Sequence, residues 1–118
     1  MLLDDLTKMI FVDNLNFDKL RKEEKLPLDV SCIYFLFNDW ELVYIGETKN
    51  LRYRIYHHYY NLQCVFPINV SLYTDEYYKP FNKVGYIPLN DLSYKLRWYL
   101  EQSYIDEYEP KFNKERLI

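Results

Sequence analysis

The chain has 118 residues, which is close to the commonest size of one domain and too short for two independent hydrophobic cores. Aromatic residues make up 19% of it, glycine occurs only twice and alanine is absent, so large side chains must fill the interior and global disorder is excluded. A formal net charge of −3 argues against a protein that coats nucleic acid non-specifically, because such binding needs many Lys and Arg contacts with phosphates.

A basic window lies inside this acidic chain. No Asp or Glu occurs between Thr48 and Thr74, and the window opens with a group of basic side chains, Lys49, Arg52, Arg54, His57 and His58. These charges are interpreted either as an ordinary solvated surface or as a local patch for phosphates.

Several features bear on compartment and origin. Cys32 and Cys64 are the only cysteines, which is neither a disulfide framework nor a set of zinc ligands. The first residues do not resemble a secretory signal, and no apolar run has the length of a membrane span. We therefore expect a soluble, cytoplasmic protein with no membrane partner. The abundance of Tyr, Asn, Lys and Ile beside so little Ala and Gly is typical of AT-rich coding DNA, as found in a phage, a mobile element or an AT-rich bacterium.

The first half of the chain predicts helices followed by a hairpin. Apolar residues spaced among charges over residues 3–26 predict two short amphipathic helices that end before Pro27. Residues 32–37 and 41–45 are rich in aromatic and β-branched side chains and flank the turn signal Asn38-Asp39, which predicts a β-hairpin.

The second half predicts a helix, a strand and a helix. The first of these helices follows Gly46, is capped by Thr48 or Asn50 and extends to about Leu62. Residues 83–88 predict a third strand. The last helix is capped by Asn90 or Asp91 and runs to about Tyr108. The fold class is therefore a small α/β domain with a three-stranded central sheet flanked by helices, and residues 1–30 form an N-terminal helical extension packed on the core.

Glu101 is unusual on the last predicted helix. At roughly 100° per residue, the polar stripe of this helix falls elsewhere, and Glu101 shares an arc with Tyr104 and Ile105 that should be partly buried. A buried carboxylate needs a partner, a metal ion or a raised pKa. The open alternatives are an ion pair with Arg97 one turn earlier, exposure at the edge of the helix, or a metal site.

The order and spacing of several motifs resemble a known family. Cys32-Ile33-Tyr34 and Tyr44-Ile45-Gly46, separated by residues 35–43, are similar to the paired tripeptides that name the GIY-YIG nucleases. The family's further elements match, in order, Leu51, Arg54, His58, Glu101 and Asn113. The resemblance covers about residues 31–114 and makes 31–118 the catalytic domain. It departs from the pattern at Cys32, which replaces a glycine; an extended core position would tolerate this, whereas close approach by DNA would not.

The resemblance implies a metal-dependent endonuclease that hydrolyses DNA phosphodiester bonds by a one-metal mechanism. Tyr34 is the favoured general base, and Tyr44 orients the water or the phosphate. A phenol with a pKa of about 10 is a poor base unless cations stabilise its phenolate, a field that Arg54, His58 and the metal would supply.

The remaining site residues have implied roles of their own. Arg54 binds the scissile phosphate, His58 contacts the tyrosine or the phosphate, and Glu101 holds Mg²⁺ or Mn²⁺. Contacts with nucleic acid are expected from Lys49, Arg52 and His57, whereas Gly46 and Asn113 organise the backbone near the site.

Two alternatives stay open. One is a catalytically silent domain that binds nucleic acid or a partner protein, which the acidic surface and Cys32 favour. The other is a subunit whose targeting domain is a separate chain, because little sequence remains for recognition once the catalytic core is built. The endonuclease itself would act on duplex or branched DNA, and the N-terminal helices would offer the surface for a homodimer.

Overall fold

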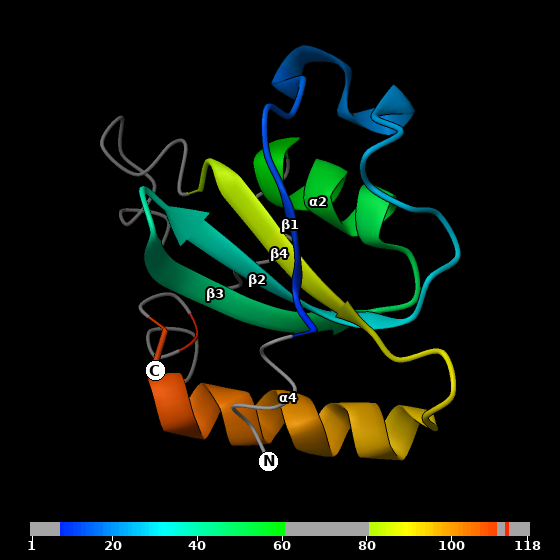
Figure 1. The fold of residues 1–118 in the computed structure, drawn as a ribbon, viewed down its shortest axis with the longest axis vertical. Helices are drawn as coiled ribbons and strands as arrows, with labels where there is room; N and C mark the ends of the chain where they lie inside the picture. The colour runs from blue at the N-terminus through cyan, green and yellow to red at the C-terminus, as the bar shows by residue number, and fades with distance from the viewer. Residues whose placement is uncertain (1–7, 61–80, 111–112, 114–118) are drawn as a thin grey trace.

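A computed structural model describes residues 8–60, 81–110 and 113 of the chain. Its centre is an antiparallel sheet of four strands in the order β1-β4-β2-β3, with α2 against one face and α4 against the other (Figure 1). The elements are β1 (Ile10–Val12), the 3-10 helix η1 (Phe17–Lys22), β2 (Cys32–Asn38), β3 (Glu41–Thr48), α2 (Leu51–Tyr60), β4 (Lys83–Pro88) and α4 (Tyr94–Tyr108).

The central strand β2 separates two hydrophobic clusters. Its alternate residues Tyr34 and Leu36 pack with Leu51 and Ile55 of α2, on what we name the α2 face. The intervening residues pack with Ile45, Ile87 and Tyr104 on the opposite side, which we name the α4 face. Burial on both faces explains why residues 32–36 read as a continuous apolar run.

The predicted hairpin is confirmed, but its turn lies one residue further along the chain than predicted. Asp39 and Trp40 occupy the two turn positions, both with positive φ (50° and 73°), while Asn38 pairs with Glu41. Two hydrogen bonds hold Asp39: its N–H donates to Asn82 Oδ1 (3.0 Å), and its Oδ1 accepts from Asn82 Nδ2 (2.8 Å).

A β-bulge interrupts the hairpin and changes which side chains share a face. Phe37 lies opposite Leu42, but Leu36 lies opposite Tyr44, so the register skips Val43. One extra residue on one strand reverses the facing of every later pair. With uniform pairing from the turn, Tyr34 would lie opposite Ile45, and Tyr44 would point to the other face. The bulge therefore brings Tyr34 and Tyr44 to the same side.

The N-terminal segment departs from the predicted helical extension. Residues 10–12 form a fourth strand paired with β4, and η1 is a 3-10 helix interrupted at Lys19. The physical reason is that Ile10, Phe11 and Val12 form a short run with high β-propensity that satisfies the backbone groups along the open edge of β4. Leu15, Leu20 and Leu26 are buried in the cluster on the α2 face, so this segment shares the core. Residues 1–7 lie outside the described range.

Both long helices begin with side-chain caps. Asn50 Oδ1 accepts from Tyr53 N–H (3.1 Å) at the start of α2, as one of the two predicted caps. Ser93 caps α4, accepting from Leu96 N–H (3.3 Å), rather than the predicted Asn90 or Asp91. Asn90 is already engaged, because its Oδ1 accepts from Ser31 N–H (2.8 Å). The predicted end of α4 at Tyr108 is confirmed, whereas the predicted end of α2 at Leu62 lies outside the described residues.

Candidate active site

Gly46 allows the tip of Tyr34 to cross the edge strand. The two residues are paired across β2 and β3, and β3 is the outer strand of the sheet. A Cβ atom at position 46 would collide with Cζ and Oη of Tyr34 and lie only 2.8 Å from Cε1. The φ angle of Gly46 is not positive, so the glycine is required for space and not for backbone freedom. The hydroxyl of Tyr34 consequently lies over the Gly46 backbone, toward the open edge of the sheet.

Tyr34, Tyr44 and His58 form one buried aromatic group on the α2 face. Tyr34 Oη and His58 Nε2 are joined by a hydrogen bond of 2.7 Å. The ring centroids of the two tyrosines are 6.1 Å apart, and those of Tyr44 and His58 are 4.8 Å apart. Tyr34 and His58 are fully buried and Tyr44 is 2% exposed. His58 therefore shares the buried stripe of Leu51 and Ile55 on α2, because these residues recur at helical spacing.

Arg54 supplies the cation next to this group, but it does not make Tyr34 acidic. Burial raises the pKa of Tyr34 well above its ordinary value, and the charges of Tyr44 and Glu101 raise it further, while the charge and hydrogen bond of Arg54 lower it. The predicted field that stabilises a phenolate is thus too weak in the protein alone. Burial also works against the charge of Arg54, but the neighbouring Tyr34, Tyr44 and Glu47 outweigh it, so the pKa of Arg54 is raised and it remains a cation.

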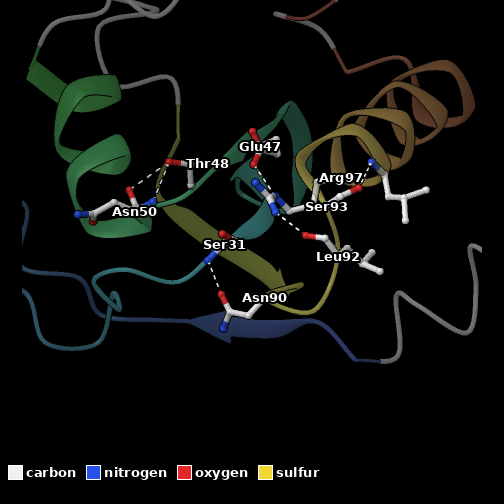
Figure 2. A network of polar contacts seen from close by, with 9 residues as sticks. Ser31, Glu47, Thr48, Asn50, Asn90, Leu92, Ser93 and Arg97 are labelled. Carbon is white, nitrogen blue, oxygen red and sulfur yellow. Dashed lines mark hydrogen bonds and ion pairs between the residues drawn. The ribbon is translucent and has the colours of Figure 1, made fainter.

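Glu101, on α4, acts on the same phenol through its charge. It is half-buried, and its Oε1 accepts from Gln102 Nε2 (3.3 Å). The ion pair weighed from the sequence does not hold it, because Arg97 bonds Glu47 Oε2 through Nε at 2.8 Å, with side-chain exposures of 6% and 11%. Arg97 Nη1 also donates to the Leu92 carbonyl (2.6 Å), so the guanidinium lies between β3 and the start of α4 (Figure 2).

The phenol of Tyr34 is thus hydrogen-bonded to an imidazole and to a guanidinium, and a carboxylate of α4 acts on it through its charge. The first two groups can pass a proton, the third can bind an anion, and the fourth is a ligand for a hard cation. Within residues 8–60, 81–110 and 113, no three His, Cys, Asp or Glu side chains are arranged to hold a metal ion by themselves. The one-metal site predicted at Glu101, completed by water and substrate oxygens, stays a prediction.

The same arrangement of helices and strands is found in solved structures. The sequence matches no protein-family model and none of the curated proteins. The structure is similar to the crystal structure of the GIY-YIG N-terminal endonuclease domain of UvrC from Thermotoga maritima bound to its catalytic magnesium ion, with a TM-score of 0.56 and 23% identity over 80% of this chain and 96% of that one. The chain has the GIY-YIG fold. Two tyrosine-to-phenylalanine mutants of the same domain, each with its catalytic divalent cation, give TM-scores of 0.56 at 22% identity, covering 80% of this chain and 94% and 96% of theirs.

Within the GIY-YIG fold of this chain, Asn113 closes the open edge beside the site. Its Oδ1 accepts from Ile45 N–H (2.7 Å), its Nδ2 donates to the Ile45 carbonyl (2.8 Å), and its side chain is buried. These two backbone groups point away from β2, so the amide acts as one more residue of a strand. Asn113 thereby fixes the residue that lies between Tyr44 and Gly46.

The residues predicted to bind nucleic acid lie in different surroundings. Lys49 is exposed just before α2. His57 is half-buried with its ring against Tyr53, at a centroid distance of 4.3 Å. Arg52 instead donates from Nε to the Leu26 carbonyl (2.8 Å) and so ties α2 to the N-terminal segment.

Glu47 was not singled out from the sequence, although it follows Gly46 directly. An ion pair between Arg97 and Glu101 was one of the three alternatives left open, and the structure pairs Arg97 with Glu47 instead. Cys32 is fully buried in the cluster on the α2 face, so its replacement of a glycine alters the core and not a surface that approaches DNA. In the part of the chain that the structure describes, no helix has the length and apolarity to cross a membrane.

Proposed function

We propose that the protein is a metal-dependent endonuclease that hydrolyses DNA phosphodiester bonds, with Tyr34 as the general base. The observation that carries this proposal is the position of the Tyr34 hydroxyl, which crosses Gly46 and meets His58 Nε2 at 2.7 Å while the charges of Arg54 and Glu101 act on it. General acid–base groups must lie within hydrogen-bonding reach of the proton that they transfer.

The raised pKa of Tyr34 defines the path of the proton. Tyr34 enters the reaction as a neutral phenol, since burial disfavours its phenolate. It can accept a proton from the attacking water only as it donates its own proton to His58 Nε2. Tyr34 and His58 thus act as a pair, and Tyr44 orients the water or the phosphate.

Arg54 and Glu101 act on the phosphate. The guanidinium of Arg54 binds a non-bridging oxygen and offsets the charge that develops in the transition state. Glu101 would hold one Mg²⁺ or Mn²⁺ ion, which supplies Lewis-acid polarisation of the phosphate when it is bound. Buried Arg97 and Glu47 position the turn of α4 that precedes Glu101, and Gly46 and Asn113 position the edge strand.

A cleavage assay tests the proposal. The protein is incubated with supercoiled plasmid, branched DNA and RNA in Mg²⁺ or Mn²⁺, with Tyr34→Phe and Glu101→Gln as variants. The matched controls are Tyr86→Phe, directly opposite Tyr34 on β4, and Asp106→Asn, an exposed acid of α4. We expect losses of about 10²–10⁴-fold for Tyr34→Phe and a loss of metal-dependent cleavage for Glu101→Gln, with both controls active.

The competing function is a silent GIY-YIG domain that binds nucleic acid or a partner protein. The complete burial of Tyr34 and His58 favours it. Absence of cleavage on every substrate, together with retained binding of DNA, would establish this second function.

A further inference from the structure

The N-terminal half of α4 exposes two aromatic rings on the flank that leads to Glu101. Tyr94 is 58% exposed and Trp98 is 49% exposed. Residues four and three apart are neighbours on a helix, so Tyr94, Trp98 and Glu101 follow one another along one stripe. Adjacent exposed rings form an apolar patch, and apolar patches rimmed by polar residues mark binding sites.

The first ring of this stripe is held in place from behind. The guanidinium of Arg97 lies over the ring of Tyr94, 5.8 Å from its centroid, and Arg97 is itself fixed by Glu47 and the Leu92 carbonyl. One face of the Tyr94 ring is thus covered while the ring as a whole stays more than half exposed. Such a ring can stack on a flat ligand without first losing conformational freedom.

The charge along α4 selects the kind of ligand. The turns that carry Tyr94 and Trp98 carry one exposed cation, Lys95, and their first carboxylate is Glu101, the proposed cation ligand. Arg97 is buried, and its charge is balanced by Glu47. The other acids of the helix, Asp106 and Glu107, both lie beyond the stripe. The first half of α4 therefore carries no uncompensated negative charge that would repel a polyanion, whereas the second half does.

We propose that Tyr94 and Trp98 stack on unpaired bases of the DNA strand whose phosphate lies at Glu101. This inference rests on the proposed nuclease function and deepens it, because it makes single-stranded or branched DNA the substrate class. Aromatic side chains bind bases of any sequence through the exposed faces of the rings. The two rings are separated along the helix by about 6 Å, more than the spacing of about 3.4 Å between neighbouring bases of a duplex strand, so they suit bases that no longer stack on each other.

The fluorescence of Trp98 tests this contact directly. Trp40 and Trp98 are the only tryptophans, so a Trp40→Phe protein reports on Trp98 alone. The protein is titrated with a short oligothymidylate in EDTA, and in parallel with an abasic strand of the same length. We expect quenching of Trp98 by the oligothymidylate and none by the abasic strand. Equal responses to the two strands would overturn the proposal, because phosphates alone would then explain binding.

Binding by variants supplies the second measurement. In fluorescence anisotropy with a labelled splayed DNA, Tyr94→Ala and Trp98→Ala should each weaken binding about tenfold and should change binding to a fully paired duplex much less. Tyr99→Ala and Leu96→Ala, at positions 64% and 52% exposed on the other side of the helix, are the matched controls. Equal weakening by all four variants would contradict a stripe that contacts bases.

Two outcomes separate this inference from its alternatives. If the wild-type protein cleaves no DNA but Trp98 is still quenched by bases, the nuclease function fails and the base contact stands. If light scattering finds a dimer that Trp98→Ala dissociates, the stripe is an interface between two copies, and the proposal is wrong.

Discussion

The two faces of the sheet use alternate residues of the same strands but are filled in different ways. The α4 face is closed by apolar side chains such as Ile33, Phe35 and Ile87, with Tyr104 as its largest ring. The α2 face holds the larger apolar cluster, but it also encloses the rings of Tyr34, Tyr44 and His58, and the polar atoms of Tyr34 and His58 meet inside the core. The α2 face thus carries the proposed chemistry at a cost in desolvation.

Edge strand β3 connects the two faces. Its three consecutive residues Ile45, Gly46 and Glu47 bind Asn113, make room for Tyr34 and pair with Arg97, respectively. Glu101 belongs to the helix on the α4 face but acts on a phenol of the α2 face. The candidate site therefore depends on how α4 is anchored to β3, and not only on the face that holds the tyrosines.

Breaking that anchor should have the largest effect. Glu47→Leu leaves the Arg97 cation buried without its carboxylate, which should cost about 3–5 kcal/mol in the free energy of unfolding, measured by urea denaturation. The control is Asp13→Asn, which removes the exposed pair between Asp13 and Lys83 (3.6 Å) and should cost less than about 1 kcal/mol.

A double variant sharpens this result. Glu47→Leu combined with Arg97→Met buries no charge and should regain much of the lost stability. The position of α4 would then depend on packing alone, so cleavage should remain impaired. If Glu47→Leu alone proved as stable as the wild type, the anchoring role of the pair would be refuted.

The two glycines provide the next test, because they lie on opposite faces. Gly46→Ala would drive a methyl group into the buried ring of Tyr34 and should cost about 1–3 kcal/mol, with loss of cleavage. A Cβ at Gly85 would instead meet Met9 Sδ at 2.5 Å and Phe11 Cε1 at 3.3 Å. Met9 is a flexible side chain that can move away, so Gly85→Ala should change stability by less than about 1 kcal/mol. If Gly46→Ala lowered the free energy of unfolding no more than Gly85→Ala does, the ring of Tyr34 would be free to move away from the added methyl group.

The last prediction concerns an effect that is absent at neutral pH and appears only in alkali. Burial raises the pKa of Cys32 to about 12, from 9.0, and the charge of Glu47 adds to this shift. The unfolded chain then loses the thiol proton first, so the stability contributed by the protonated Cys32 is complete below pH 9 and decreases as pH rises toward 12. The slope should reach about 1.4 kcal/mol per pH unit for this group. Urea denaturation over this range should give a shallower decrease for Cys32→Ala, and an identical pH profile for both proteins would contradict the assignment.

Most of the secondary structure could be predicted from the sequence, because it depends on local patterns. The apolar runs on either side of Asn38-Asp39 gave the hairpin, and the spacing of Leu51 and Ile55 gave α2. The strand at residues 10–12 was missed, since three residues carry too little periodicity to distinguish a strand from a helix and the decisive factor was the open edge of β4.

The sequence by itself nominated Tyr34, Tyr44, Arg54, His58 and Glu101 as the candidate site, through the resemblance of their motifs to the GIY-YIG nucleases. Only the tertiary structure decided which of them lie together. Without the bulge at Val43, the alternation of a strand would place the two tyrosines on opposite faces. The choice of Glu47 over Glu101 as partner of Arg97 was likewise decided by the packing of α4 against β3. Both outcomes depend on pairing between segments distant in sequence, which local periodicity does not encode.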